Sequence, residues 1–297
     1  AARPIRHVGD EEPPPPIPLL PDQVGRPTIL LASEADVRAS ALRPLRLQPA
    51  HRPGGVVWAE DRGDHQSGAL WTEKVPGGGE DAPPTFIRDH RRRVALLGVY
   101  DGLGGAGAAV ARSLHDGTTY TDAYVASRLA RAAVEEWFSG LIGRGRADDR
   151  PLPAQIHDAI SVALDDELPY LDAERAELKG SLARRLPTTF AGAMVRPAPS
   201  GEVSVLALWA GNSRTFVLRP EQGLQQLSRD DTRADDALEQ LRTDGPMTNV
   251  ISADRPFDLR RHSTKVAGPA VVVCATDGAF GDVPTPALFE HVLLSTL

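Results

Sequence analysis

Residues 94–105 read Val-Ala-Leu-Leu-Gly-Val-Tyr-Asp-Gly-Leu-Gly-Gly, and the prediction of the fold starts from them. Its first seven residues form a short apolar run, which is typical of a buried strand. The Asp-Gly pair that follows places Asp101 at the end of that strand. Glycine at 102 lets the backbone turn sharply and approach a ligand closely. The stretch therefore predicts a core strand that presents one carboxylate at a cleft.

Two further apolar runs are also followed by acidic residues. The apolar run at residues 270–276 ends in Asp277 and Gly278, and Glu60 and Asp61 follow the apolar residues 56–58. A single Asp-Gly pair is weak evidence, because this pair is common in turns. Carboxylates that converge from several strand ends repel one another unless a hard cation neutralises them. The pattern therefore predicts a Mg²⁺ or Mn²⁺ site with oxygen ligands.

The remaining periodicity favours an α+β fold over alternating α/β units. Short connections join apolar strands at 188–196, 203–210 and 214–218, which predicts antiparallel hairpins. Helical patterns are expected at residues 106–114, 119–141, from 153 onward, 235–242 and 286–297.

Composition excludes several classes of protein. The chain has 297 residues, and 33 basic against 40 acidic side chains give a net charge of −7, which argues against a general nucleic-acid binder. One cysteine excludes an internal disulfide framework. No apolar run is long enough to span a membrane, and no secretory signal is visible, so a cytoplasmic protein is expected. Residues 1–50 are Pro-rich and predicted to be largely disordered, ahead of a folded domain at 51–297.

Taken together, the motifs resemble those of the metal-dependent PPM/PP2C-type serine/threonine protein phosphatases, in their bacterial form. Residues 99–105 are similar to that family's Phe-Asp-Gly-His-Gly-Gly signature. Further similar segments occur in the family's order: Glu-Asp-Arg at 60–62, Thr-Thr-Phe-Ala at 188–191, Gly-Asn-Ser-Arg at 211–214, Leu-Ser-Arg-Asp at 227–230 and Thr-Asp-Gly at 276–278. The resemblance covers residues 53 to 290.

This resemblance implies a four-layer αββα sandwich that binds two Mg²⁺ or Mn²⁺ ions at one end. It implies that Asp101 bridges the ions, that the Gly102 carbonyl completes one shell and that Asp277 holds the other ion. Glu60 or Asp61 would bind one ion directly or through water. The implied reaction is hydrolysis of phosphoserine or phosphothreonine in proteins by a metal-activated water. The implied partners are a phosphorylated protein substrate and a Ser/Thr kinase, with no nucleic acid and no membrane.

Three departures from the family pattern support an alternative. The sequence stops at Leu297, before the family's late Asp-Asn motif, so a metal ligand and C-terminal strands are expected to be missing. Asn212 stands where the family has aspartate, and no phosphate-binding arginine is visible before Glu60. The alternative is a pseudophosphatase with weak or no activity that serves as a phosphoprotein-binding regulatory module.

Overall fold

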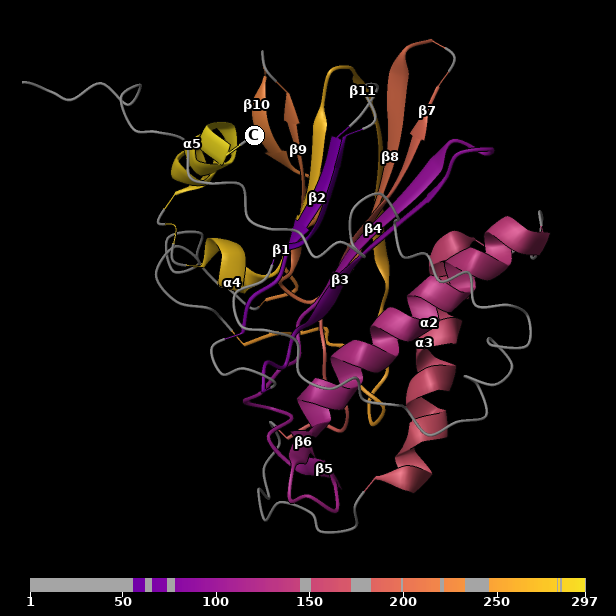
Figure 1. The fold of residues 1–297 in the computed structure, drawn as a ribbon, viewed down its shortest axis with the longest axis vertical. Coiled ribbons are helices and arrows are strands. Elements are labelled where there is room, and N and C mark those ends of the chain that lie inside the picture. The colour runs from indigo at the N-terminus through magenta and orange to yellow at the C-terminus, as the bar shows by residue number, and fades with distance from the viewer. Residues whose placement is uncertain are drawn as a thin grey trace, which may run out of the picture.

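Two antiparallel sheets form the centre of the molecule (Figure 1). The computed structural model describes residues 56–61, 66–73, 78–144, 151–171, 183–198, 200–219, 222–232, 246–281, 283 and 285–296. The expected disordered segment at 1–50 and the expected helix at 235–242 lie outside the described residues.

The larger sheet has five strands in the order β11-β8-β7-β4-β3. The bounds of these strands are β3 (Ala82–Asp89), β4 (Val94–Tyr100), β7 (Phe190–Pro197), β8 (Glu202–Ala210) and β11 (Arg260–Ala267). Side chains alternate across a strand, so each apolar strand covers both faces of the sheet. In β4, Leu96 and Tyr100 pack on one face, whereas Leu97 packs on the other. The apolar run at residues 94–100 is therefore a core strand, as predicted.

Two helices cover the first face of this sheet. They are α2 (Asp122–Arg144) and α3 (Leu152–Glu167), followed by the short 3₁₀ helix η2 (Leu168–Tyr170). Figure 1 shows α2 and α3 side by side along the sheet. Fully buried residues of both helices, among them Val134, Phe138 and Ile160, pack with Leu96 and Phe190 of the strands. This is the largest apolar cluster in the described part of the chain.

A three-stranded sheet packs on the second face. Its order is β10-β9-β12, with β9 (Arg214–Arg219), β10 (Gly223–Gln226) and β12 (Val271–Ala275). Ala193 and Val205 meet Val217 and Val272 between the two sheets. On the outer face, Phe216 packs with α4 (Asp277–Phe280) and α5 (Pro286–Thr296). The layers are therefore helix, sheet, sheet and helix, which confirms the predicted α+β sandwich.

Two hairpins lie outside these sheets: β1 (Val56–Asp61) with β2 (Gln66–Leu70), and β5 (Val110–Ser113) with β6 (Thr119–Thr121). The helix predicted at 106–114 is wrong, because β5 occupies its second half. Gly117 adopts a φ of +85° and turns the chain so that β6 pairs with β5. The Ala-rich composition favoured a helix, but the flanking Asp-Gly turn determines the local structure.

Cys274 lies on β12, at the contact between the two sheets. Burial raises the pKa of its thiol to about 12, which agrees with a packing residue rather than a nucleophile. None of the described helices has the length and apolar character needed to cross a membrane.

Candidate metal centre

Asp101 directly follows β4 and lies where three strand ends meet. The residue is only 9% exposed. Its backbone carbonyl accepts hydrogen bonds from the Thr189 amide and the Thr188 hydroxyl, both at 2.8 Å. These bonds tie the end of β4 to the segment that leads into β7. The backbone of Asp101 is therefore held by β4, which precedes it, and by the hydrogen bonds that its carbonyl accepts.

Asp81 is brought to the same place by strand register. It directly precedes β3, and β3 runs antiparallel to β4 with Ala82 opposite Tyr100. The residue before Ala82 therefore lies beside the residue after Tyr100, which is Asp101. The Thr276 hydroxyl donates to Asp81 Oδ2 at 3.2 Å, which links this carboxyl to the end of β12.

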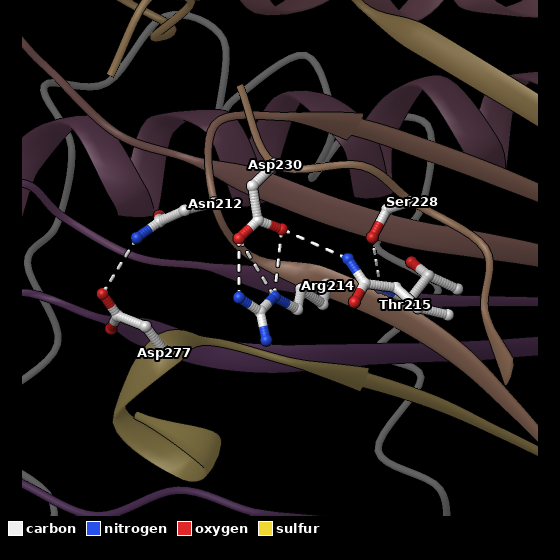
Figure 2. Close-up of polar contacts among 7 residues, drawn as sticks. Asn212, Arg214, Thr215, Ser228, Asp230 and Asp277 are labelled. Carbon is white, nitrogen blue, oxygen red and sulfur yellow. Dashed lines mark hydrogen bonds and ion pairs between the residues drawn. The ribbon is translucent and has the colours of Figure 1, made fainter. Parts of the chain in front are cut away.

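Asp277 comes from the second sheet. It follows β12 and is the first residue of α4. The side-chain amide of Asn212 donates to Asp277 Oδ2 at 3.0 Å (Figure 2). Because β12 packs against β4 and β7, its end lies over the end of β4. The two Asp-Gly positions that the sequence singled out are thus side by side.

The three carboxyls interact directly. Asp101 hydrogen-bonds to both Asp81 and Asp277. Burial, and then repulsion by Asp81 and Asp277, raises the pKa of the Asp101 carboxyl to about 10. Burial likewise raises the pKa of Asp81, and the hydrogen bonds from Asp101 and Thr276 oppose this effect. The cluster therefore needs either a shared proton or a cation to stay assembled.

The donor set fits a hard divalent cation. Carboxylate and carbonyl oxygens are the ligands that Mg²⁺ and Mn²⁺ prefer, and a cation would offset the repulsion that now raises the pKa of Asp101. Asn212 adds a neutral oxygen: its Oδ1 is buried and has no hydrogen-bond partner among the described residues. The His, Cys, Asp and Glu side chains of the described ranges nevertheless form no group of three that is already spaced around an ion.

The raised pKa of Asp101 predicts a specific pH dependence of stability without metal. From its ordinary pKa of 3.8 up to about 10, Asp101 stays protonated only in the folded protein. The unfolded chain then releases a proton, so the contribution of Asp101 to stability is full below 3.8 and is lost as pH rises towards 10. In EDTA, Tm is expected to fall between pH 5 and pH 9, and Asp101→Asn is expected to flatten this fall. Equal slopes in the two proteins would contradict the prediction.

Gly102 permits a close backbone contact beside Asp101. Its carbonyl accepts a hydrogen bond from the Gly104 amide at 2.9 Å. A Cβ at position 102 would lie 2.5 Å from the carbonyl oxygens of both Ala123 and Glu80. These are backbone atoms of two elements, so neither can rotate away.

Gly102→Ala is therefore expected to destabilise the protein by about 1–3 kcal/mol, because the added methyl group must displace main chain on two sides. Denaturant unfolding measures the change. Gly105→Ala is the matched control, since a Cβ there meets nothing within 4 Å. A Gly102→Ala protein as stable as this control would contradict the close approach.

Helix α2 holds the segment that carries Asp81. Ser127 Oγ donates to the Glu80 carbonyl at 2.5 Å, and Arg128 donates to the carbonyls of Gly79 and Glu80 at 3.1 and 3.3 Å. The Arg128 guanidinium also lies 3.3 Å above the ring of Tyr124. Arg128 therefore stabilises the loop through its carbonyls, and its positive charge lies near Asp81.

The structure groups the predicted site residues unevenly. Asp101, Gly102 and Asp277 lie together. Glu60 and Asp61 end β1, opposite Ser67 and Gln66 of β2, and their side chains lie outside the described part of the structure.

Sequence reasoning missed Asp81. Residues 75–84 carry so many glycines and prolines that they predicted a surface loop. The available signal was a second Glu-Asp doublet, at 80–81, directly before the strand that precedes β4.

The chain is similar to solved structures of phosphatases. A bacterial serine phosphatase shares 19% identity over 73% of this chain and 78% of that chain, with a TM-score of 0.47. A serine/threonine phosphatase of S. agalactiae shares 14% identity over 84% and 85%, with a TM-score of 0.47. No family model and no curated protein match the chain. A further similar structure, at 13% identity over 81% and 91% with a TM-score of 0.44, is the PPM Ser-Thr phosphatase MsPP from Mycobacterium smegmatis.

Proposed function

We propose that this protein hydrolyses phosphoserine and phosphothreonine esters in proteins with the help of two Mg²⁺ or Mn²⁺ ions. The observation that carries the proposal is the convergence of Asp81, Asp101 and Asp277 from three strand ends. Three carboxyls in contact are costly unless they bind a cation. Asp101 and Asp277 also occupy the positions in which the phosphatase-like motifs have acidic residues.

In this proposal each residue has a distinct task. Asp101 is central to the cluster and would contact both ions, while Asp277 would hold one ion from the side of the second sheet. Asp81 would contribute from β3, and the Gly102 carbonyl supplies a neutral oxygen. When bound, the ions would lower the pKa of a water molecule and neutralise charge on the phosphoryl group. Glu60 and Asp61 remain candidates for a contact through water.

The substrate class follows from the same chemistry. A phosphorylated side chain presents a dianion, which bound cations would attract although the whole chain carries a net charge of −7. A phosphorylated protein is therefore the proposed substrate, and a cytoplasmic Ser/Thr kinase is the proposed source of it.

The test combines metal binding with turnover. Titration calorimetry with MnCl₂ should detect binding, and a phosphothreonine peptide should release inorganic phosphate only when Mn²⁺ or Mg²⁺ is present. Asp277→Ala should abolish both signals, whereas Asp165→Ala, at an exposed position on α3, should retain both. A protein that binds no Mn²⁺ and releases no phosphate would refute the proposal.

A second candidate is a phosphoprotein-binding module with little or no turnover. Two observations favour it: Asn212 places an amide where the family has a carboxylate, and Arg128 already donates to backbone carbonyls and to Ser127. The guanidinium whose charge acts on Asp81 therefore already has hydrogen-bond partners within the fold. Fluorescence anisotropy with a labelled phosphopeptide separates the candidates, because Mn²⁺-dependent binding without phosphate release would identify the module.

A further inference from the structure

The turn between β8 and β9 contacts Asp277 through the side chain of Asn212 (Figure 2). Gly211 adopts a φ of +100°, which brings Asn212 towards the first residue of α4. Asn212 is 8% exposed. Its amide nitrogen donates to Asp277 Oδ2 at 3.0 Å, while its Oδ1 is buried without a partner among the described residues. Among the described residues, the Asn212 side chain therefore bonds to Asp277 through its amide nitrogen and leaves its oxygen unpaired.

Asp231 holds this turn in place. Its carboxylate accepts hydrogen bonds from the Gly211 amide at 3.2 Å, from Asn249 Nδ2 at 2.6 Å and from Arg260 Nε at 2.5 Å. Its own backbone amide donates to the Gly211 carbonyl at 3.0 Å. Asp231 is 5% exposed, so its carboxylate lies away from solvent. The backbone that carries Asn212 is thus fixed independently of any ion.

The other side of the contact is fixed as well. Arg214 forms bidentate hydrogen bonds to the Asp230 carboxylate, with Nη2 at 2.6 Å (Figure 2). Its guanidinium also lies 4.1 Å from the centre of the Phe280 ring. Phe280 is the last residue of α4, and Asp277 is the first. One turn, residues 211–214, therefore contacts both ends of α4.

The type of side chain at 212 matters electrostatically. Asp277 already hydrogen-bonds to the Asp101 carboxyl on one side, and the Asn212 amide donates to it on the other. An amide that donates to a carboxylate stabilises its position without a cation. An aspartate at 212 would instead add a second carboxylate 3.0 Å from Asp277 Oδ2 if the side chain kept its place.

We propose that Asn212 is a positioning residue that holds the Asp277 carboxylate, and with it α4, in place in the metal-free protein. The Asn212 amide stabilises the Asp277 carboxylate, as a bound cation would if residue 212 were an aspartate. The consequence for metal binding rests on the proposed function, whereas the consequence for metal-free stability does not.

The experiment compares Asn212→Asp and Asn212→Ala with the unaltered protein by thermal unfolding at pH 7.5, in EDTA and in saturating MnCl₂. In EDTA, Asn212→Ala should lower Tm by about 3–10 °C, because it removes one hydrogen bond to a charged group. Asn212→Asp should lower Tm further, and Mn²⁺ should raise its Tm by more than it raises that of the unaltered protein. An Asn212→Asp protein with unchanged Tm in EDTA would overturn the inference.

A charge exchange separates positioning from packing. Asn212→Asp combined with Asp277→Asn restores one amide and one carboxylate at the contact, so its Tm in EDTA should exceed that of Asn212→Asp. Asp277→Asn alone completes the double-mutant cycle. The rise in Tm that Asp277→Asn causes in the Asn212→Asp protein should exceed the change in Tm that it causes in the unaltered protein. Additive effects would overturn the inference. Absence of any Mn²⁺ shift in the unaltered protein would instead refute the proposed function, since the EDTA measurements do not depend on metal.

Discussion

Asp101→Asn is expected to lower kcat/KM for a phosphothreonine peptide more than about 100-fold. Replacing groups that only support a metal ligand typically costs 10- to 100-fold, and Asp101 is the central carboxyl of the proposed centre. It hydrogen-bonds to both Asp81 and Asp277, so its loss removes the one group that joins all three. Phosphate release at saturating Mn²⁺ measures the change, and calorimetry measures the accompanying loss of Mn²⁺ affinity.

The same substitution is expected to raise stability in EDTA. Asparagine keeps the shape of the side chain and removes a buried acid that two neighbours repel. Activity and metal-free stability should therefore move in opposite directions, which a misfolded variant cannot mimic. Asp116→Asn is the control, because Asp116 is exposed in the turn between β5 and β6. Full turnover by Asp101→Asn would show that the cluster has no part in the reaction.

Local patterns predicted the core and two of the three carboxyls in the cluster. The apolar run at 94–100 required a strand buried on both faces, and Leu96 and Leu97 indeed pack against different layers. The short turn before β8 correctly predicted its antiparallel pairing with β7. The hairpin predicted between β8 and β9 is wrong, because the chain passes to the second sheet there and β9 pairs with β10 and β12. Because Asp101 and Asp277 each directly follow such a core segment, their positions could be inferred from the strands alone.

Asp81 could not be found in this way, because its place depends on a pairing register. A shift of β3 by one residue against β4 would move Asp81 to the other face of the sheet. The sequence of 75–84 contains no signal for that register, and its glycines and prolines suggested a loop. The same limit explains the wrong helix at 106–114, where the Gly117 turn pairs β5 with β6. Non-local contacts and turn geometry prevailed over composition in both places.

Asp81→Asn is expected to lower Mn²⁺ affinity at least about tenfold and to reduce turnover with it. Asp81 lies between Asp101, to which it hydrogen-bonds, and Thr276, which donates to its Oδ2 at 3.2 Å. Asparagine retains an oxygen for that hydroxyl but removes the charge that would attract a cation. Calorimetry with MnCl₂ and phosphate release measure the two effects.

Asp89→Asn is the matched control for this substitution, since Asp89 lies at the other end of β3. Its carboxylate accepts a hydrogen bond from the Arg91 amide at 2.8 Å. Asp61→Asn tests the doublet that the sequence motifs indicated. Register in β3 assigns the metal contact to Asp81, whereas motif similarity assigns it to Glu60 or Asp61. If Asp81→Asn bound Mn²⁺ normally and Asp61→Asn did not, the first doublet would supply the ligand, and the contact of Asp81 with Asp101 would be structural only.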